Sequence, residues 1–369
     1  MGSGMLAGER RARVVGAMAE AGVEAMLVYG NGWQCDYLRY ACDFGILEGH
    51  GLVLLTGDGQ AELFLDSAVE AERAEAETTG FTVHLVPDIS RAVARRLERI
   101  GNRRIAAAPM RALPGFLADR ARGLALKDGT AIIDRLMMHK LPGEIETLRR
   151  AAVLADEGYE VFKRAARPGR PQYELIADVE AFFRTKGCPE NFMIMGSGGK
   201  EVWGMAPPSD RRIAAGDLVT TELTPAIDGY FSQICRTLVV GKASEAQKKA
   251  HAVYREAMEA GIATVRPGVT AADVARAEND VFRKYGLGDY VTSQYTRVRG
   301  HGLGLYADGK PSILEDVDTV LQAGMVIIVH PNTYHPDCGY MVLGDTVLVT
   351  EKGADVLIRT PRELFEAPV

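Results

Sequence analysis

The sequence predicts an α/β protein of two domains. Its 369 residues exceed the usual size of one hydrophobic core, and 47% apolar with 25% charged residues is an ordinary globular composition. Short apolar strands and helical stretches alternate up to about residue 135, and a helix–helix–strand unit then occurs twice. The first pattern is typical of a small α/β domain. The second indicates a pseudo-symmetric domain whose site lies between its halves.

The first domain is expected to open with an amphipathic helix over residues 8–22. Strands follow at 25–29, 51–55 and 61–65, and glycine-containing turns close the first two. The composition changes at 137–143, where Pro and Gly precede a long helical pattern. We therefore expect an N-terminal domain over 5–136 and a C-terminal domain over 143–369.

The second domain is expected to repeat one order of elements. Two helices precede a strand-rich block, and two more helices precede another. The expected ranges are 144–167 and 172–187 for the first helices, 191–241 for the first block, 244–265 and 270–285 for the second helices, and 291–359 for the second block.

Charge and cysteine content narrow the partners. The net charge of −6 is mild and no basic run exceeds four residues, so we expect neither nucleic acid nor a membrane surface as partner. The five cysteines form no C-x-x-C pair, which fits reduced thiols. No segment approaches the roughly 18 apolar residues of a membrane span, and the N-terminus lacks the apolar stretch of a secretion signal. A cytoplasmic protein that binds a small molecule is expected.

Five ordered phrases in the second domain point to one family. They are Gly216-Asp217-Leu218-Val219, Asp228-Gly229-Tyr230 with Arg236-Thr237, Gly300-His301-Gly302-Leu303-Gly304, Ala323-Gly324-Met325-Val326 and Asp345-Thr346-Val347-Leu348-Val349-Thr350. With these phrases the chain resembles the creatinase, prolidase and aminopeptidase P family over most of its length. The resemblance implies a creatinase-like N-terminal domain, a pita-bread C-terminal domain and a homodimer.

The resemblance also shows where the family's metal site has changed. Metallopeptidases of this family hold two bridged divalent ions with Asp, Asp, His, Glu and Glu, and these places fall on Glu222, Gln233, His301, His330 and Gly344. Gln233 and Gly344 remove two anionic donors, so a second metal is not expected to bind tightly.

Two further family histidines are also replaced. The family's substrate-side His falls on Met205 and its later catalytic His on Asp308. We therefore expect the ordinary peptidase reaction to be lost. Creatinase-like hydrolysis lacks its general base and both of its glutamates here.

The residues that remain suggest a different metal site. Glu222, His301 and His330 match the 2-His-1-carboxylate triad that holds Fe(II) and leaves positions open for substrate and dioxygen. The leading hypothesis is a non-peptidase oxidoreductase or lyase with one divalent metal, Fe(II) favoured, acting on a small polar molecule. The alternatives are a creatinase-type C–N hydrolase that needs no metal and a catalytically inactive binding module.

Other residues beside these phrases are weaker candidates. Asp308, Tyr306 and Gln233 are candidate catalytic residues, and Met205, Trp203 and Tyr340 are candidates for substrate binding. By resemblance, Trp33 and Arg39 of the N-terminal domain could reach across a dimer interface into the neighbour's pocket. Arg236 is interpreted as a structural ion pair, Cys235 as buried and inert, and Arg299 as solvated on the surface.

Overall fold

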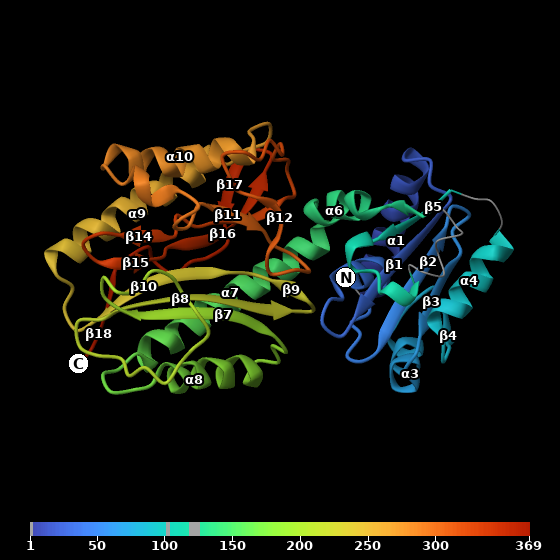
Figure 1. Ribbon diagram of the computed structural model, residues 1–369, viewed down its shortest axis with the longest axis horizontal. Helices are drawn as coiled ribbons and strands as arrows, with labels where there is room; N and C mark the ends of the chain where they lie inside the picture. The colour runs from blue at the N-terminus through green and yellow to red at the C-terminus, as the bar shows by residue number, and fades with distance from the viewer. Residues whose placement is uncertain (1–2, 101–103, 118–125) are drawn as a thin grey trace. The chain divides into compact units, whose positions relative to one another are not determined.

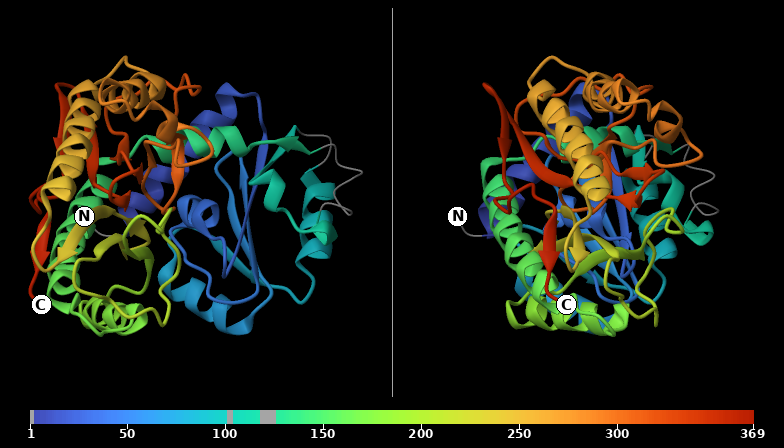
Figure 2. Two further views of the ribbon diagram at one scale, coloured as in Figure 1. Left: turned by 60° about the vertical axis from the view of Figure 1, so that its left-hand side comes forward. Right: turned by 90° about the vertical axis from the view of Figure 1, so that its left-hand side faces the viewer.

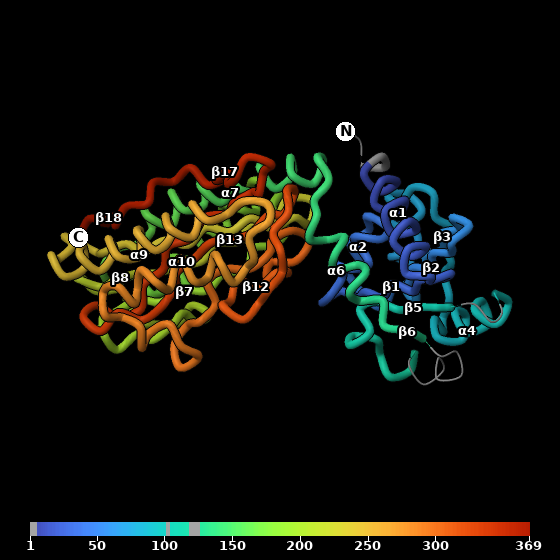
Figure 3. The backbone as a smooth tube through the Cα atoms, turned by 90° about the horizontal axis from the view of Figure 1, so that it is seen from above, coloured from blue at the N-terminus to red at the C-terminus, as the bar shows by residue number. Residues whose placement is uncertain are grey.

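The computed structural model describes residues 3–100, 104–117 and 126–369 (Figure 1). The chain forms two compact units, Met1–Met137 and Met138–Val369. In the tube of Figure 3, the chain passes from the first unit to the second through α6 (Thr130–Met138). None of the helices in the described ranges is long and apolar enough to cross a membrane.

The first unit is built on a mixed sheet. Over the described residues its strands run in the order β4-β3-β2-β1-β5-β6, with β1 antiparallel to β2 and parallel to β5. The strands are β1 (Ala25–Asn31), β2 (His50–Thr56), β3 (Ala61–Leu65), β4 (Thr82–Leu85), β5 (Ile105–Ala108) and β6 (Lys127–Asp128). The helices are α1 (Ser3–Glu20), α2 (Asp36–Cys42), α3 (Ala68–Glu77), α4 (Ile89–Ile100) and the 3₁₀ turn η1 (Met110–Ala112).

The apolar strands of the first unit are buried as their composition predicts. Leu27, Leu54 and Phe64 lie in one core cluster with Val93 and Leu97 of α4. The strand expected at 61–65 is β3, whereas the first helix begins at Ser3 and ends at Glu20, two residues before the expected end.

The second unit contains two helix pairs and a large sheet. The helices are α7 (Pro142–Ala165), α8 (Gln172–Thr185), α9 (Glu245–Thr264), α10 (Ala271–Lys284) and the 3₁₀ turn η3 (Gly288–Val291). The strands are β7 (Asn191–Gly198), β8 (Leu218–Ile227), β9 (Tyr230–Phe231), β10 (Ile234–Val240), β11 (Gly300–Gly302), β12 (Gly309–Ser312), β13 (Val326–Val329), β14 (Thr333–His335), β15 (Gly339–Met341), β16 (Gly344–Thr350), β17 (Gly353–Val356) and β18 (Phe365–Ala367).

The sheet joins the two repeats edge to edge. Its main path is β12-β11-β13-β16-β10-β8-β7, and every pairing along that path is antiparallel. α7 contacts β8 and β10, whereas α9 contacts β13 and β17. Figure 1 shows α10 and α8 at opposite edges of this unit with the strands between them, and Figure 2 shows the chain from two further directions.

Local signals set the ends of the second helix pair. Ser244 precedes α9, where its hydroxyl accepts a hydrogen bond from Gln247 N and its own N–H donates to the Gln247 side chain. Thr270 and Asp273 make the same reciprocal cap at α10. Because these capping residues lie next to the helix ends in the sequence, the observed helices differ from the expected ranges by only one residue at each end.

Candidate active site

The candidate residues form one row across the large sheet. Glu222 of β8 pairs with Cys235 of β10, which in turn pairs with Gly344 of β16. His330 follows β13, and a Cβ added at Gly344 would lie 2.7 Å from its Cβ. His301 lies in β11, the strand that pairs with β13. The row therefore crosses the line at which the two repeats meet.

Two glycines explain how His301 is placed in this row. A Cβ at Gly300, whose φ is +149°, would lie 2.0 Å from Ile328 O, and a Cβ at Gly302 would lie 1.9 Å from Lys310 O. Because both neighbouring strands approach the backbone so closely, the residues on either side of His301 must lack side chains. The Gly-His-Gly phrase is therefore a packing requirement around one functional side chain.

Glu222 is a buried carboxyl held by hydrogen bonds. Its Oε1 accepts a hydrogen bond from Asn332 Nδ2 at 2.8 Å, and the Cys235 thiol is a second partner. Burial raises the pKa of the Glu222 carboxyl to about 7; the charge of Asp308 adds to the rise, and the two hydrogen bonds oppose it. This carboxyl can therefore accept or donate a proton near neutral pH.

The two imidazoles face each other. The ring centroids of His301 and His330 are 5.4 Å apart in an edge-to-face arrangement. Burial lowers the pKa of both rings, well below the usual value for His330, where His301 contributes to the lowering. Nδ1 of His330 is buried and has no hydrogen-bond partner on another described residue. Both rings are therefore uncharged near neutral pH.

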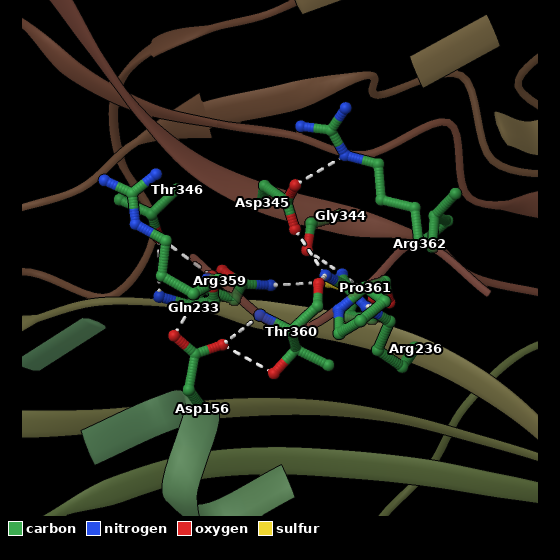
Figure 4. Close-up of polar contacts among 12 residues, drawn as sticks. Asp156, Gln233, Arg236, Gly344, Asp345, Thr346, Arg359, Thr360, Pro361 and Arg362 are labelled. Carbon is green, nitrogen blue, oxygen red and sulfur yellow. Dashed lines mark hydrogen bonds and ion pairs between the residues drawn. The ribbon is translucent and has the colours of Figure 1, made fainter. Parts of the chain in front are cut away.

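The opposite side of the same strands carries paired charges (Figure 4). The guanidinium of Arg236 donates to Asp345 Oδ1 at 2.7 Å and to the backbone oxygen of Gly344 at 2.8 Å. Asp345 also accepts from Arg362 Nε at 2.8 Å, and Thr360 O accepts from Arg236 at 2.6 Å. The prediction that Arg236 forms a structural ion pair matches this arrangement, which ties β10 to β16 directly behind Gly344.

A pair of divalent ions does not fit the residues present. Gln233 offers a neutral amide, hydrogen-bonded through Nε2 to Cys235 Sγ at 3.5 Å, and Gly344 offers no side chain. The charges of two dications would therefore be poorly balanced.

The facial triad of Glu222, His301 and His330 remains a prediction. Across the described ranges no group of three His, Cys, Asp or Glu side chains is placed to hold a metal ion. Glu222 faces Asn332 and Cys235, whereas His301 and His330 face each other. The metal role predicted for these three residues gains no support from their placement.

The three predicted catalytic residues differ in their exposure to solvent. Asp308 is exposed, with Oδ1 3.6 Å from His301 Nδ1, and Tyr306 is also exposed. Gln233 is buried beside Cys235. The roles assigned to Asp308, Tyr306 and Gln233 remain predictions.

The substrate-side candidates lie near a group of aromatic rings. Tyr340 is buried and shares a hydrogen bond of 2.8 Å with Thr296. Trp203 is mostly exposed and stacks on Tyr334 with ring centroids 4.8 Å apart, and Met205 is half-buried two residues further on. Their roles in substrate binding remain predictions.

In the first unit, Trp33 is fully exposed and Arg39 is half-buried. Their predicted reach into a neighbouring subunit also remains a prediction.

Two functional candidates were missed or misread from the sequence. Asn332, which holds Glu222, carried no signal because its partner lies 110 residues away in the chain. Arg299 was expected on the surface and is fully buried, because its guanidinium donates to Asn279 Oδ1 at 2.6 Å and to Asn332 O at 2.8 Å. An arginine directly before the Gly-His-Gly strand could have been recognised as an inward-facing residue only from the strand's register.

Comparison with known proteins identifies the family. The model of the metallopeptidase family M24 matches residues 146–351, and that of the creatinase/prolidase N-terminal domain matches residues 10–139. The chain belongs to the M24 family. The changed positions Gln233 and Gly344 therefore lie in a chain whose two domains both match this family.

The similar proteins are peptidases by name. The chain is 34% identical over 236 residues to a Xaa-Pro dipeptidase of Pyrococcus furiosus, covering 63% of this chain and 67% of that one. The structure of a Xaa-Pro dipeptidase from Bacillus anthracis superposes with a TM-score of 0.85 at 26% identity, covering 98% of this chain and 99% of that one. A prolidase from Pyrococcus horikoshii superposes with a TM-score of 0.85 at 27% identity, covering 97% and 100%.

These comparisons confirm the fold and correct the function. The predicted creatinase-like domain followed by a pita-bread domain is confirmed. The predicted non-peptidase oxidoreductase or lyase is wrong, because the relatives are Xaa-Pro dipeptidases. The creatinase-type and inactive alternatives do not fit them either, whereas the runner-up prediction of a hydrolase is consistent with them. The M24 description supports divalent metals for the family and does not support iron in particular. The error arose because lost ligands were taken to mean a changed reaction class.

Proposed function

We propose that this chain is a hydrolase that cleaves the amide bond of a dipeptide or a similar small substrate. The observation that carries the proposal is the match of nearly the whole chain to Xaa-Pro dipeptidase structures, with Glu222 and His301 in the row described above. A hydrolase also needs a group that accepts and donates protons near neutral pH, and Glu222 is such a group.

In this proposal, Glu222 handles the proton. Its ionised form takes a proton from the attacking water, and its protonated form then delivers that proton to the nitrogen that leaves as an amine. A carboxyl whose pKa is about 7 is suited to both steps, because both forms are populated near neutrality. No proton is gained or lost over the cycle.

The imidazoles of His301 and His330 take a second part. Because both rings are uncharged and buried, each can place an N–H or a lone pair toward a polar substrate without bringing a buried positive charge. We assign them to hydrogen bonding with the substrate carbonyl region, beside the carboxyl that moves the proton.

The cofactor proposed for this chain is at most one divalent ion per chain. The argument is the loss of anionic donors: Gln233 and Gly344 offer no carboxylate, so a pair of ions would lack the negative charge that it needs. Iron has no advantage over manganese, cobalt or zinc in this proposal. A metal analysis that finds close to two equivalents in active protein contradicts it.

The experiment is a hydrolysis assay with a panel of Xaa-Pro and other dipeptides, with and without added Mn²⁺, Co²⁺ or Zn²⁺. We expect amide cleavage, reduced about 100-fold or more by Glu222→Gln, because general acid–base groups contribute at least this much. Glu201→Gln, an exposed substitution, is the matched control and should change the rate less than twofold. Absence of amide hydrolysis by the wild type under all of these conditions sinks the proposal.

Location and assembly are part of the same proposal. We propose a cytoplasmic homodimer that acts on a small molecule without nucleic acid or membrane. Light scattering during gel filtration should give about twice the 40.0 kDa mass of the chain.

A further inference from the structure

Asn332 is a buried amide with a fixed orientation. It follows His330 and Pro331 after β13 and is 1% exposed. Its Oδ1 accepts from Leu343 N at 3.2 Å, and its Nδ2 donates to Glu222 Oε1 at 2.8 Å. A backbone N–H can only donate, so Oδ1 must face Leu343 and the NH₂ group must face Glu222.

Arg299 holds the segment that carries this amide. Its buried guanidinium donates to Asn332 O at 2.8 Å, and its own backbone oxygen accepts from His330 N at 3.0 Å. The segment is thus fixed at two points by one residue. Asn279 fixes the guanidinium in turn, accepting from its Nε at 2.6 Å. The Asn332 side chain is therefore held against Glu222 rather than free to turn away.

The Asn332 amide engages an oxygen of the Glu222 carboxyl. A carboxylate binds a hard divalent ion through oxygen lone pairs, and here Oε1 already accepts from Asn332 while Cys235 is a second hydrogen-bond partner of the carboxyl. An NH₂ group carries partial positive charge and cannot coordinate a cation. A dication approaching Glu222 would meet this donor at short range.

We propose that Asn332 excludes a divalent ion from Glu222, with its amide standing where a cation would otherwise bind the carboxylate. The proposal deepens the proposed function, on which it rests only for placing Glu222 in the active site. It predicts that one atom-for-atom change, from amide NH₂ to carboxylate oxygen, creates a cation site. Two carboxylates within hydrogen-bond distance repel each other when both are ionised, so the pair either holds one shared proton or binds a cation.

The test is a titration with Mn²⁺ alone, by calorimetry, on protein freed of metal. We expect Asn332→Asp to bind one Mn²⁺ at least tenfold more tightly than the wild type, and Asn332→Asp/Glu222→Gln to lose that gain. Asn332→Leu is the matched control: it fills the same space without a donor or a ligand and should show no gain. Equal affinity of wild type and Asn332→Asp, or equal gains in the Asp and Leu variants, overturns the proposal.

A second measurement covers folding. Mn²⁺ should raise the melting temperature of Asn332→Asp and leave that of the wild type unchanged, because only the variant has the site. If Asn332→Asp does not fold in either condition, Asn332→Gly removes the amide, and we expect at least threefold tighter Mn²⁺ binding than in the wild type; no difference contradicts the proposal. The titration uses no substrate, so its result is separate from the outcome of the hydrolysis assay.

Discussion

The strands β10 and β16 differ sharply on their two faces. On one face, Arg236 and Asp345 form a fully buried ion pair, to which Arg362 adds a second cation. On the other face, the neighbouring residues Cys235 and Gly344 carry no charge. Successive residues of a strand point to opposite sides, so one face can change while the other is kept.

The comparison teaches that, in β10 and β16, the residues that stabilise the fold and the residues of the candidate site lie on opposite faces. The charged face joins β10, β16 and the segment at Thr360 through backbone oxygens, so a change there affects folding. On the neutral face, Cys235 contacts Gln233 and Glu222 of the site. A family resemblance carried by the scaffold can therefore survive the loss of catalytic ligands, and the two faces should respond differently to substitution.

The largest expected effect comes from breaking the charged face. Asp345→Asn removes the charge that balances Arg236 in a buried position, and we expect a loss of about 3–5 kcal/mol in the free energy of unfolding. Urea unfolding followed by circular dichroism measures it. Asp355→Asn, which breaks the more exposed pair with Arg149, is the control and should cost less than about 1 kcal/mol. Similar losses in the two variants would mean that burial does not distinguish the pairs.

A smaller effect is expected from crowding the neutral face. A Cβ at Gly344 would lie 2.7 Å from His330 Cβ and 3.0 Å from Cys235 Sγ, so Gly344→Ala forces a shift that should cost about 1–3 kcal/mol. Gly16→Ala, in the exposed face of α1 with nothing within 4 Å of the added Cβ, is the control and should stabilise by up to about 1 kcal/mol. An unchanged free energy of unfolding in Gly344→Ala would show that His330 and Cys235 can move aside without cost.

The same crowding limits any return to a two-metal site. His330 fills part of the space that a side chain at position 344 would need, so Gly344→Glu alone is expected to destabilise the protein without adding a metal. The change must be accompanied by substitution of His330. Mass spectrometry of the metal content checks this: Gly344→Glu alone should bind no more metal than the wild type, and any gain should require the additional substitution of His330.

The last comparison concerns the pH response of a buried carboxyl that has no ion pair with another described residue. Glu278 of α10 is fully buried, and neither carboxyl oxygen has a hydrogen-bond partner among the described residues. Burial raises the pKa of Glu278 well above its usual value, and the charge of Arg299 opposes the rise. The folded state therefore keeps a proton that the unfolded state releases above its own pKa of about 4.5.

The sign of the pH dependence follows. The contribution of Glu278 to stability is complete below the unfolded pKa and is lost as pH rises toward the folded one. We expect the free energy of unfolding of Glu278→Gln, relative to that of the wild type, to be higher at pH 8 than at pH 5. Urea unfolding of both proteins at the two pH values measures this difference. A difference between variant and wild type that is the same at both values would show that Glu278 ionises in the folded protein much as it does in the unfolded chain.

Much of the fold could be predicted because its signals are local. Short apolar strands such as Ala61–Leu65 and capped helices such as α9 and α10 are set by residues within a few positions of one another. The candidate row was reached through family phrases rather than through periodicity. The reaction was inferred wrongly, because lost ligands were taken to mean a changed reaction class, whereas the similar proteins are Xaa-Pro dipeptidases.

The sequence by itself determined the two-domain α/β fold, the repeat of helices and strands, and the loss of acidic side chains at positions 233 and 344. Only the tertiary structure decided that Asn332 faces Glu222, that Arg299 is buried and donates to Asn332 O, and that His301 and His330 face each other. The reason is distance along the chain. Glu222 and Asn332 are brought together by strand pairing over 110 residues, and no local pattern records which side chain will meet which across such a sheet.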